Sequence, residues 1–192
     1  MRVLVEAAQA GDHESFGELV RLHQRVAVRT AMAALGSRAD AEDAAQEAFL
    51  LAWRKLHTFR ADAAFRTWLL KIVWRQAVGS RRAGQRWWDR LRPANRRRSA
   101  ATNVDRAFTD ALPCGGPSPE AAAIGRSLAR QTARAISRLP PHLRDTLLLA
   151  ASGAHSYAEI GLLLGVATGT VKWRVSEARR LVSLAMEDHR ER

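Results

Sequence analysis

The first 92 residues of this 192-residue chain contain no proline, and no other feature of the sequence limits its fold as strongly. Proline interrupts helices because it lacks a backbone N–H and its ring clashes with the preceding turn. Apolar residues recur at helical spacing in the same stretch, namely at Phe16, Leu19, Val20, Val26 and Ala27. The N-terminal part of the chain is therefore predicted to be entirely α-helical.

Short polar breaks divide this stretch into separate helices. Gly11 and Asp12 interrupt the first segment, Gly36-Ser37 predicts a turn, and Asp40 is a suitable N-cap. The predicted helices run from Ser15 to Leu35, from Asp40 to about His57, and, after a loop from Thr58 to Ala64, from Phe65 to about Arg82.

The composition changes after Arg82. Between Arg81 and Arg106 the chain contains nine arginines and only two aspartates. The string from Pro113 to Pro119 cannot be helical. These features predict a linker over residues 83–119, with partial helical character near Trp87-Trp88. The chain is therefore predicted to hold two small helical domains, residues 1–82 and 120–192.

The strongest local signal lies between Ser156 and Val182. Ser156 and Glu159 have the spacing of a capping box at the start of a short helix, and Gly165 permits a sharp turn after it. A second helix is expected from about Thr168, with its buried positions at Val171, Val175, Ala178 and Val182 and its open face basic. This pattern is typical of a DNA-binding helix-turn-helix, although an ordinary helical hairpin with a solvated basic face would share it.

The segment from Asp40 to Glu47 is an acidic island in a strongly basic chain. Asp43 and Glu47 lie four residues apart and so share one face of the predicted helix. Such a face would be repelled by DNA, which indicates a basic protein partner. The alternative is that these carboxylates bind no partner and only stabilise the N-terminal end of the helix through its dipole.

The predicted helix from Phe65 combines aromatic and basic residues. Phe65, Trp68, Leu69 and Ile72 share one face and are expected to be core, whereas Trp74 lies off that face. The basic residues outside the apolar face are Arg66, Lys71, Arg75, Arg81 and Arg82. Aromatic rings among cations suit single-stranded nucleic acid, because bases stack on the rings and phosphates pair with the cations.

The whole-chain composition favours a polyanionic partner and argues against catalysis. The formal net charge is +12, which suits nucleic acid. The single cysteine, Cys114, offers no multi-thiolate metal site, and no phosphate-binding loop or nucleophile triad is visible. No apolar run suits a membrane span and Met1 to Asp12 does not resemble a signal peptide. We therefore expect a cytoplasmic, non-enzymatic protein without cofactor or metal.

Four motifs occur in an order that resembles a known family. They are Gly11-Asp-His-Glu-Ser-Phe16, the stretch from Asp40 to Phe49, Phe65-Arg-Thr-Trp-Leu69 and Gly169-Thr-Val-Lys172. The chain resembles the extracytoplasmic-function (ECF) sigma factors of bacteria over nearly all of its length except the linker. The resemblance implies that residues 1–82 are similar to sigma region 2 and residues 120–192 to sigma region 4.

The resemblance also implies partners and site residues. The acidic helix would bind the clamp helices of the largest subunit of core RNA polymerase through Asp40, Glu42, Asp43, Gln46 and Glu47. The minus-ten element of promoter DNA would meet Arg60, Arg66, Lys71, Trp74, Arg75, Gln76, Arg81 and Arg82. The helix-turn-helix, which also touches the polymerase flap in this family, would meet the minus-thirty-five element through Thr168, Thr170, Lys172, Trp173, Arg174, Ser176, Arg179 and Arg180. Many members of the family are held inactive by an anti-sigma factor.

The sequence departs from the family pattern at several of these positions. The family often carries Arg-Asn and then Asp where this chain has Arg75-Gln76 and Gly79. It often carries Ser at the position of Trp173, and Ala167 replaces a small capping residue, so Thr168 is expected to cap instead. A helix-turn-helix regulator that binds duplex DNA without polymerase is the alternative function, but it leaves the acidic island unexplained.

Overall fold

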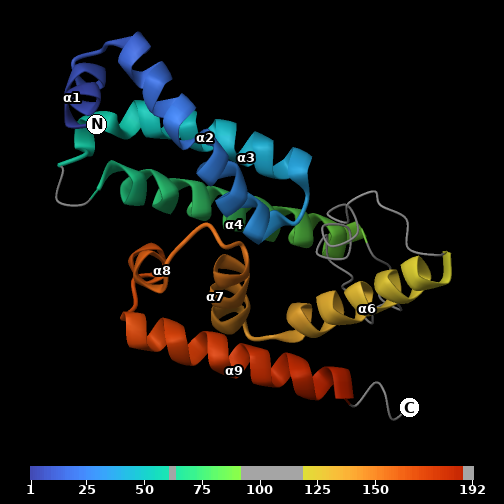
Figure 1. Ribbon diagram of the computed structural model, residues 1–192. Helices are drawn as coiled ribbons and strands as arrows, with labels where there is room; N and C mark the ends of the chain where they lie inside the picture. The colour runs from blue at the N-terminus through green and yellow to red at the C-terminus, as the bar shows by residue number, and fades with distance from the viewer. Residues whose placement is uncertain (61–63, 92–118, 188–192) are drawn as a thin grey trace.

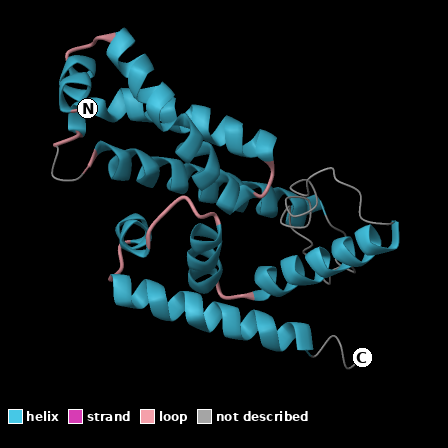
Figure 2. Ribbon diagram, in the orientation of Figure 1, coloured by secondary structure: helices cyan, strands magenta, loops and turns pink. Residues whose placement is uncertain are grey.

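The computed structural model describes residues 1–60, 64–91 and 119–187, and every regular element within these ranges is a helix (Figure 2). The all-α prediction is therefore confirmed. In chain order the elements are α1 (Arg2–Gln9), α2 (His13–Leu35), α3 (Arg38–Lys55), the 3₁₀ turn η1 (Leu56–Thr58), α4 (Phe65–Leu91), α6 (Pro119–Arg138), α7 (Pro141–Ala151), α8 (Tyr157–Leu164) and α9 (Thr168–Glu187).

Two predicted helix starts are wrong by a few residues. α2 begins after Asp12, whose carboxylate accepts hydrogen bonds from the backbone N–H groups of Glu14 and Ser15, so Ser15 lies inside the first turn. α3 begins after Ser37, whose hydroxyl accepts from the N–H of Asp40. In both cases the earlier polar residue satisfies the first free N–H groups, and the predicted start belongs to the helix.

The end of α4 also differs from the prediction. The helix does not stop near Arg82 but continues to Leu91. Residues 83–91 of the predicted linker, including the backbone of Trp87-Trp88, therefore extend α4, and the linker from 92 to 118 lies outside the described residues.

The N-terminal helices form a bundle with a small-residue core. α2, α3 and α4 pack against one another, with α1 against the start of α2 (Figure 1). Ala27, Ala48, Leu69 and Val73 are fully buried at these contacts. The alanines of α2 and α3 let the helix backbones approach closely, while α4 supplies the larger side chains that fill the centre.

The C-terminal helices pack on this bundle rather than standing apart from it. α7 lies against α2, and α8 lies against α4 (Figure 1). Buried apolar side chains from both halves, such as Leu19 and Leu149, belong to one hydrophobic cluster. In the described ranges no helix has the length and apolar character that a membrane crossing requires.

Candidate nucleic-acid interface

The helix-turn-helix is built as the sequence predicts. The Ser156 hydroxyl accepts from the N–H of Glu159, and the Glu159 carboxylate accepts from the N–H of Ser156 at 2.8 Å, which completes the capping box. Gly165 ends α8 in the left-handed region at φ 69°. Gly161 is required inside α8, where the turn packs against it, because a Cβ there would lie 2.7 Å from the carbonyl oxygen of Val166.

α9 buries one narrow face and leaves most of the predicted contact residues exposed. Val171, Val175 and Ala178 are buried, as expected, whereas Val182, also predicted to be buried, is only half-buried. Trp173 is 60 % exposed and so does not pack inside the domain. Of the other predicted contacts, Thr170 and Arg174 are half-buried, whereas Thr168, Lys172, Ser176, Arg179 and Arg180 are exposed.

Two contacts of α9 concern the position of Thr168 at its start and the pairing of Arg180 within the helix. The N–H of Val171 donates to the carbonyl of Ala167, so Ala167 holds the position before the helix and Thr168 is its first residue rather than its cap. Arg180 is paired with Glu177 one turn earlier, at 2.7 Å. Hydrogen bonding from Arg180 lowers the pKa of Glu177 and raises the pKa of Arg180, so the pair stays charged.

The acidic face of α3 is exposed to solvent. Each of the five predicted polymerase contacts is exposed; they are Asp40, Glu42, Asp43, Gln46 and Glu47. Arg38 pairs with Glu42 at 2.8 Å, and Gln76 of α4 donates a hydrogen bond to Glu47. Leu50, on the same helix, is 61 % exposed, and an exposed leucine beside carboxylates suits a protein partner better than DNA.

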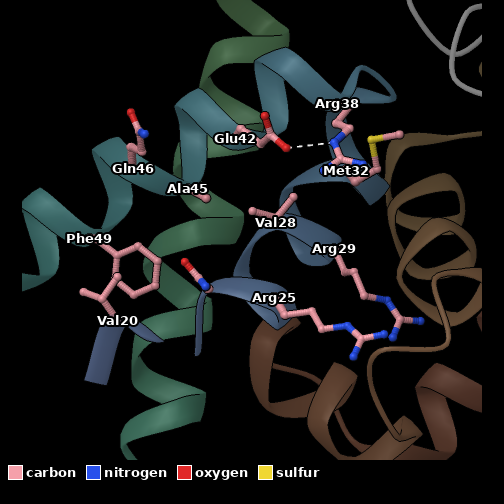
Figure 3. Close-up of a pocket in the computed structure, with 11 residues that line it drawn as sticks. Val20, Arg25, Val28, Arg29, Met32, Arg38, Glu42, Ala45, Gln46 and Phe49 are labelled. Atoms are coloured by element: carbon pink, nitrogen blue, oxygen red, sulfur yellow. Dashed lines mark hydrogen bonds and ion pairs between the residues drawn. The ribbon is translucent and has the colours of Figure 1, made fainter. Parts of the chain in front are cut away.

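A groove between α2 and α3 borders this face, and sequence reasoning missed it (Figure 3). Its volume is about 840 Å³, and its apolar wall includes Val28, Met32 and Phe49. Arg25 and Arg29 extend from α2 along one side, and Glu42 and Gln46 line the α3 side (Figure 3). The alternation of basic and apolar residues on α2 was visible in the sequence, but which side of α2 meets α3 was not.

The predicted minus-ten contacts divide into exposed and buried residues. Arg60, Arg75 and Arg82 are exposed, and Lys71 and Gln76 are half-buried. Trp74 is only 6 % exposed, and its assignment as a base-stacking residue is wrong, because it packs into the core between the helices. The apolar face of α4 is wider than the sequence pattern indicated.

Phe65 is a core residue, as expected, whereas Trp68 is half-buried and packs against the core. Their ring centroids lie 5.7 Å apart, and Phe59 packs against Trp68 at 5.3 Å and edge-on to Phe65. This aromatic cluster fixes the start of α4 against the chain that precedes it.

Two further predicted DNA contacts, Arg66 and Arg81, point toward the C-terminal half. Arg66 is paired with Glu159 of α8, and Arg81 with Asp145 of α7 at 2.8 Å.

No group of three or more His, Cys, Asp or Glu residues suited to a metal occurs in the part of the chain that the structure describes.

The comparisons with known proteins agree with this two-part arrangement. The model of "Sigma-70 region 2" matches residues 19–88, and that of "Sigma-70, region 4" matches residues 129–182. Together they define a transcription initiation factor of the sigma-70 type. The "ECF RNA polymerase sigma-E factor" of Escherichia coli (strain K12) is 32% identical over 190 residues, which cover 94% of this chain and 91% of that protein. The "RNA polymerase sigma-H factor" of Pseudomonas aeruginosa is 32% identical over 186 residues, 96% of this chain and 92% of that one. The chain belongs to the ECF family of RNA polymerase sigma factors.

Solved structures support the same fold. CnrH in complex with the cytosolic domain of CnrY has a TM-score of 0.61 at 23% identity, with 97% of both chains covered. The sigma factor RpoE in complex with the anti-sigma factor NepR from Bartonella quintana has a TM-score of 0.56 at 19% identity, with 91% of this chain and 98% of that chain covered.

Proposed function

We propose that this sigma factor binds core RNA polymerase through the acidic face of α3, reads upstream promoter DNA through α9, and holds the minus-ten element through α4 and the residues before it. The observation that carries this proposal is the separation of charge. The exposed carboxylates lie on α3, and exposed cations with Trp173 lie on α9, at the far side of the molecule (Figure 1).

The division into two contact surfaces follows from electrostatics. DNA repels Asp43 and Glu47, so the α3 face suits the basic surface of a protein. The residues of α9 fall into two groups by position. Lys172 and Trp173, near the N-terminal end, suit base edges, while Arg179 and Arg180, farther along, suit phosphates.

The groove between α2 and α3 extends the proposed polymerase surface. Its apolar wall gives a helix of the partner an area to bury, and its rim carries Arg25 and Arg29 on the α2 side and the Arg38–Glu42 ion pair on the α3 side. Such an arrangement favours one orientation of a bound helix, because the two arginines on the α2 side attract its acidic face. An anti-sigma factor, the class of protein bound to RpoE of Bartonella quintana, is a further partner for this chain. The cytoplasm, where polymerase transcribes, is the proposed place of action.

Gel-shift and run-off transcription experiments with and without core polymerase test this function. We expect tight, sequence-selective promoter binding and specific transcripts only when core polymerase is present. Equal promoter affinity without core would instead support a helix-turn-helix regulator that acts alone.

A further inference from the structure

We propose that Gln9 of α1 is a positioning residue for minus-ten recognition, because it fixes the backbone from which Arg60 extends. This inference rests on the proposed function, which assigns the minus-ten element to α4 and the residues before it. Gln9 lies outside residues 19–88, which the region 2 model matches, so its role does not follow from that match.

The side-chain amide of Gln9 joins α1 to the chain that leads into α4. Its Nε2 donates to the carbonyl of Leu56 at 3.0 Å and to the carbonyl of Phe59 at 2.9 Å. A side-chain amide has two N–H hydrogens, so these two bonds use both of them. Leu56 begins the turn η1 and Phe59 follows its last residue, so one side chain holds both ends of this turn.

The bond to Phe59 acts directly on the predicted DNA contact. The Phe59 carbonyl belongs to the planar peptide group that links Phe59 to Arg60, and Arg60 is exposed. A hydrogen bond to this oxygen fixes the plane of the peptide group, and with it the direction in which the backbone of Arg60 leaves the turn. The N–H of Phe59 donates to the carbonyl of Leu56 at 3.0 Å, so Gln9 reinforces a turn that is already closed on itself.

The side chain of Phe59 is held by a different element. Its ring centroid lies 5.7 Å from that of Phe65 and 5.3 Å from that of Trp68, both in α4. The segment is therefore attached to α4 through an aromatic ring and to α1 through two carbonyls. Loss of the Gln9 amide would leave the ring in place and release only the peptide group before Arg60.

α1 is a suitable support for this segment because it is itself anchored. Val5 and Ala8 are buried, and α1 packs against both α2 and η1. Gln9, the last residue of α1, is exposed, and with Arg60 it lines a pocket of about 520 Å³. Contacts placed on loops are held less precisely than contacts placed on helices, so a residue that fixes the loop affects how selectively it reads DNA.

Gln9→Met in the full-length chain tests this role. Methionine is close to glutamine in helix propensity but cannot donate a hydrogen bond, so α1 is kept while both bonds are lost. Gln131→Met is the matched control, because Gln131 donates to the Ser127 hydroxyl within α6, in the C-terminal half.

Two quantities are measured for each protein. Hydrogen exchange of the backbone amides of residues 57–60 in the free chain reports on the turn, and we expect about three- to tenfold faster exchange for Gln9→Met. Run-off transcription with core polymerase reports on discrimination, as the ratio between a promoter selected by the wild type and the same promoter with one minus-ten base pair changed. We expect this ratio to fall about three- to tenfold for Gln9→Met, because the contact of Arg60 is no longer aligned.

The ratio for a changed upstream base pair should stay at the wild-type value, because both bonds of Gln9 lie within the N-terminal bundle. Gln131→Met should match the wild type in every measurement. Thermal melting identifies a variant that fails to fold. Gln9→Glu, whose carboxylate cannot donate either, carries the test if Gln9→Met does so.

Unchanged exchange, or faster exchange with wild-type discrimination at the minus-ten element, would overturn the positioning role. An equal loss of discrimination at both elements would overturn it as well, because it indicates a general defect. If the wild-type holoenzyme gives no specific transcripts, the proposed function fails and the role of Gln9 fails with it. If the wild type discriminates and Gln9→Met discriminates equally well, only the role of Gln9 is wrong.

Discussion

Trp173 occupies the open side of α9, where its indole ring is 60 % exposed. A large ring exposed beside Lys172 costs solubility without contributing to the core, which favours a contact outside the chain. In the proposed complex the ring meets a base edge or a thymine methyl group in the major groove.

Trp173→Ser is therefore expected to change which upstream sequences the holoenzyme prefers, by about 1–3 kcal/mol for each lost base contact. Selection from a randomised upstream element with the wild type and the variant measures this preference. Arg179→Ala is the comparison, because loss of a phosphate contact should weaken all promoters similarly and reduce the salt dependence. Identical selected sequences from wild type and Trp173→Ser would show that the ring reads no base.

Trp74 contrasts with Trp173, because it is buried. The sequence pattern placed this aromatic residue outside the core, and the structure places it inside. We expect Trp74→Ala to lower the free energy of unfolding by about 3–5 kcal/mol, as for other large buried aromatic residues. Arg75→Ala, at the exposed neighbouring position, should change it by no more than about 0.5 kcal/mol. Urea denaturation of both variants measures the difference, and equal stabilities would contradict the core assignment.

At the scale of elements, the sequence predicted which segments are helical. It predicted only in part which face of each helix is buried. Periodicity identified the buried face of α9 and the cap of α8, because those signals are local. The starts of α2 and α3 differ from the prediction, since two polar residues three positions apart can each cap the same helix. The buried face of α4 was underestimated, because α4 packs against α2, α3 and α8 and is covered over more of its circumference than one apolar stripe requires.

The acidic face of α3 is the element whose role is most directly testable. Asp43→Arg is expected to weaken binding to core polymerase at least about tenfold, because repulsion replaces attraction at the interface. Asp43 is exposed, so the free energy of unfolding should change by no more than about 0.5 kcal/mol.

Glu14→Arg reverses a charge at another exposed position and is the control for this experiment. Pull-down titrations with core polymerase compare the two variants with the wild type. Undiminished binding by Asp43→Arg would remove the α3 face from the proposed polymerase surface.

At the scale of the whole molecule, the contact between the two halves was beyond sequence reasoning. Thr30 and His155 are separated by 125 residues, and neither belongs to a motif. Complementarity of two surfaces depends on the positions of many side chains at once, and no periodicity along the chain encodes it. The packed arrangement of the two halves is called the closed state here, and an arrangement in which they are separated is called the open state. The contact makes the stability of the closed state depend on pH, a property that neither half would have alone.

Burial, together with the nearby cations Arg66 of α4 and Arg29 of α2, lowers the pKa of His155 to about 4. In an open state the imidazole would regain its ordinary pKa of about 6.5. The neutral ring therefore stabilises the closed state fully above about pH 6.5, and this stabilisation is lost as the pH falls toward about 4. At about pH 5 the loss amounts to about 2 kcal/mol.

We accordingly expect the radius of gyration of the free protein to increase between about pH 7.5 and about pH 5. Burial also lowers the pKa of His23, so acid affects the N-terminal bundle as well. His155→Gln separates the two effects, because the glutamine amide can still donate to Thr30 but cannot titrate. The variant should keep its radius over the range in which the wild type opens, whereas parallel changes in both proteins would assign the response to His23 or to general acid unfolding and not to the closed contact.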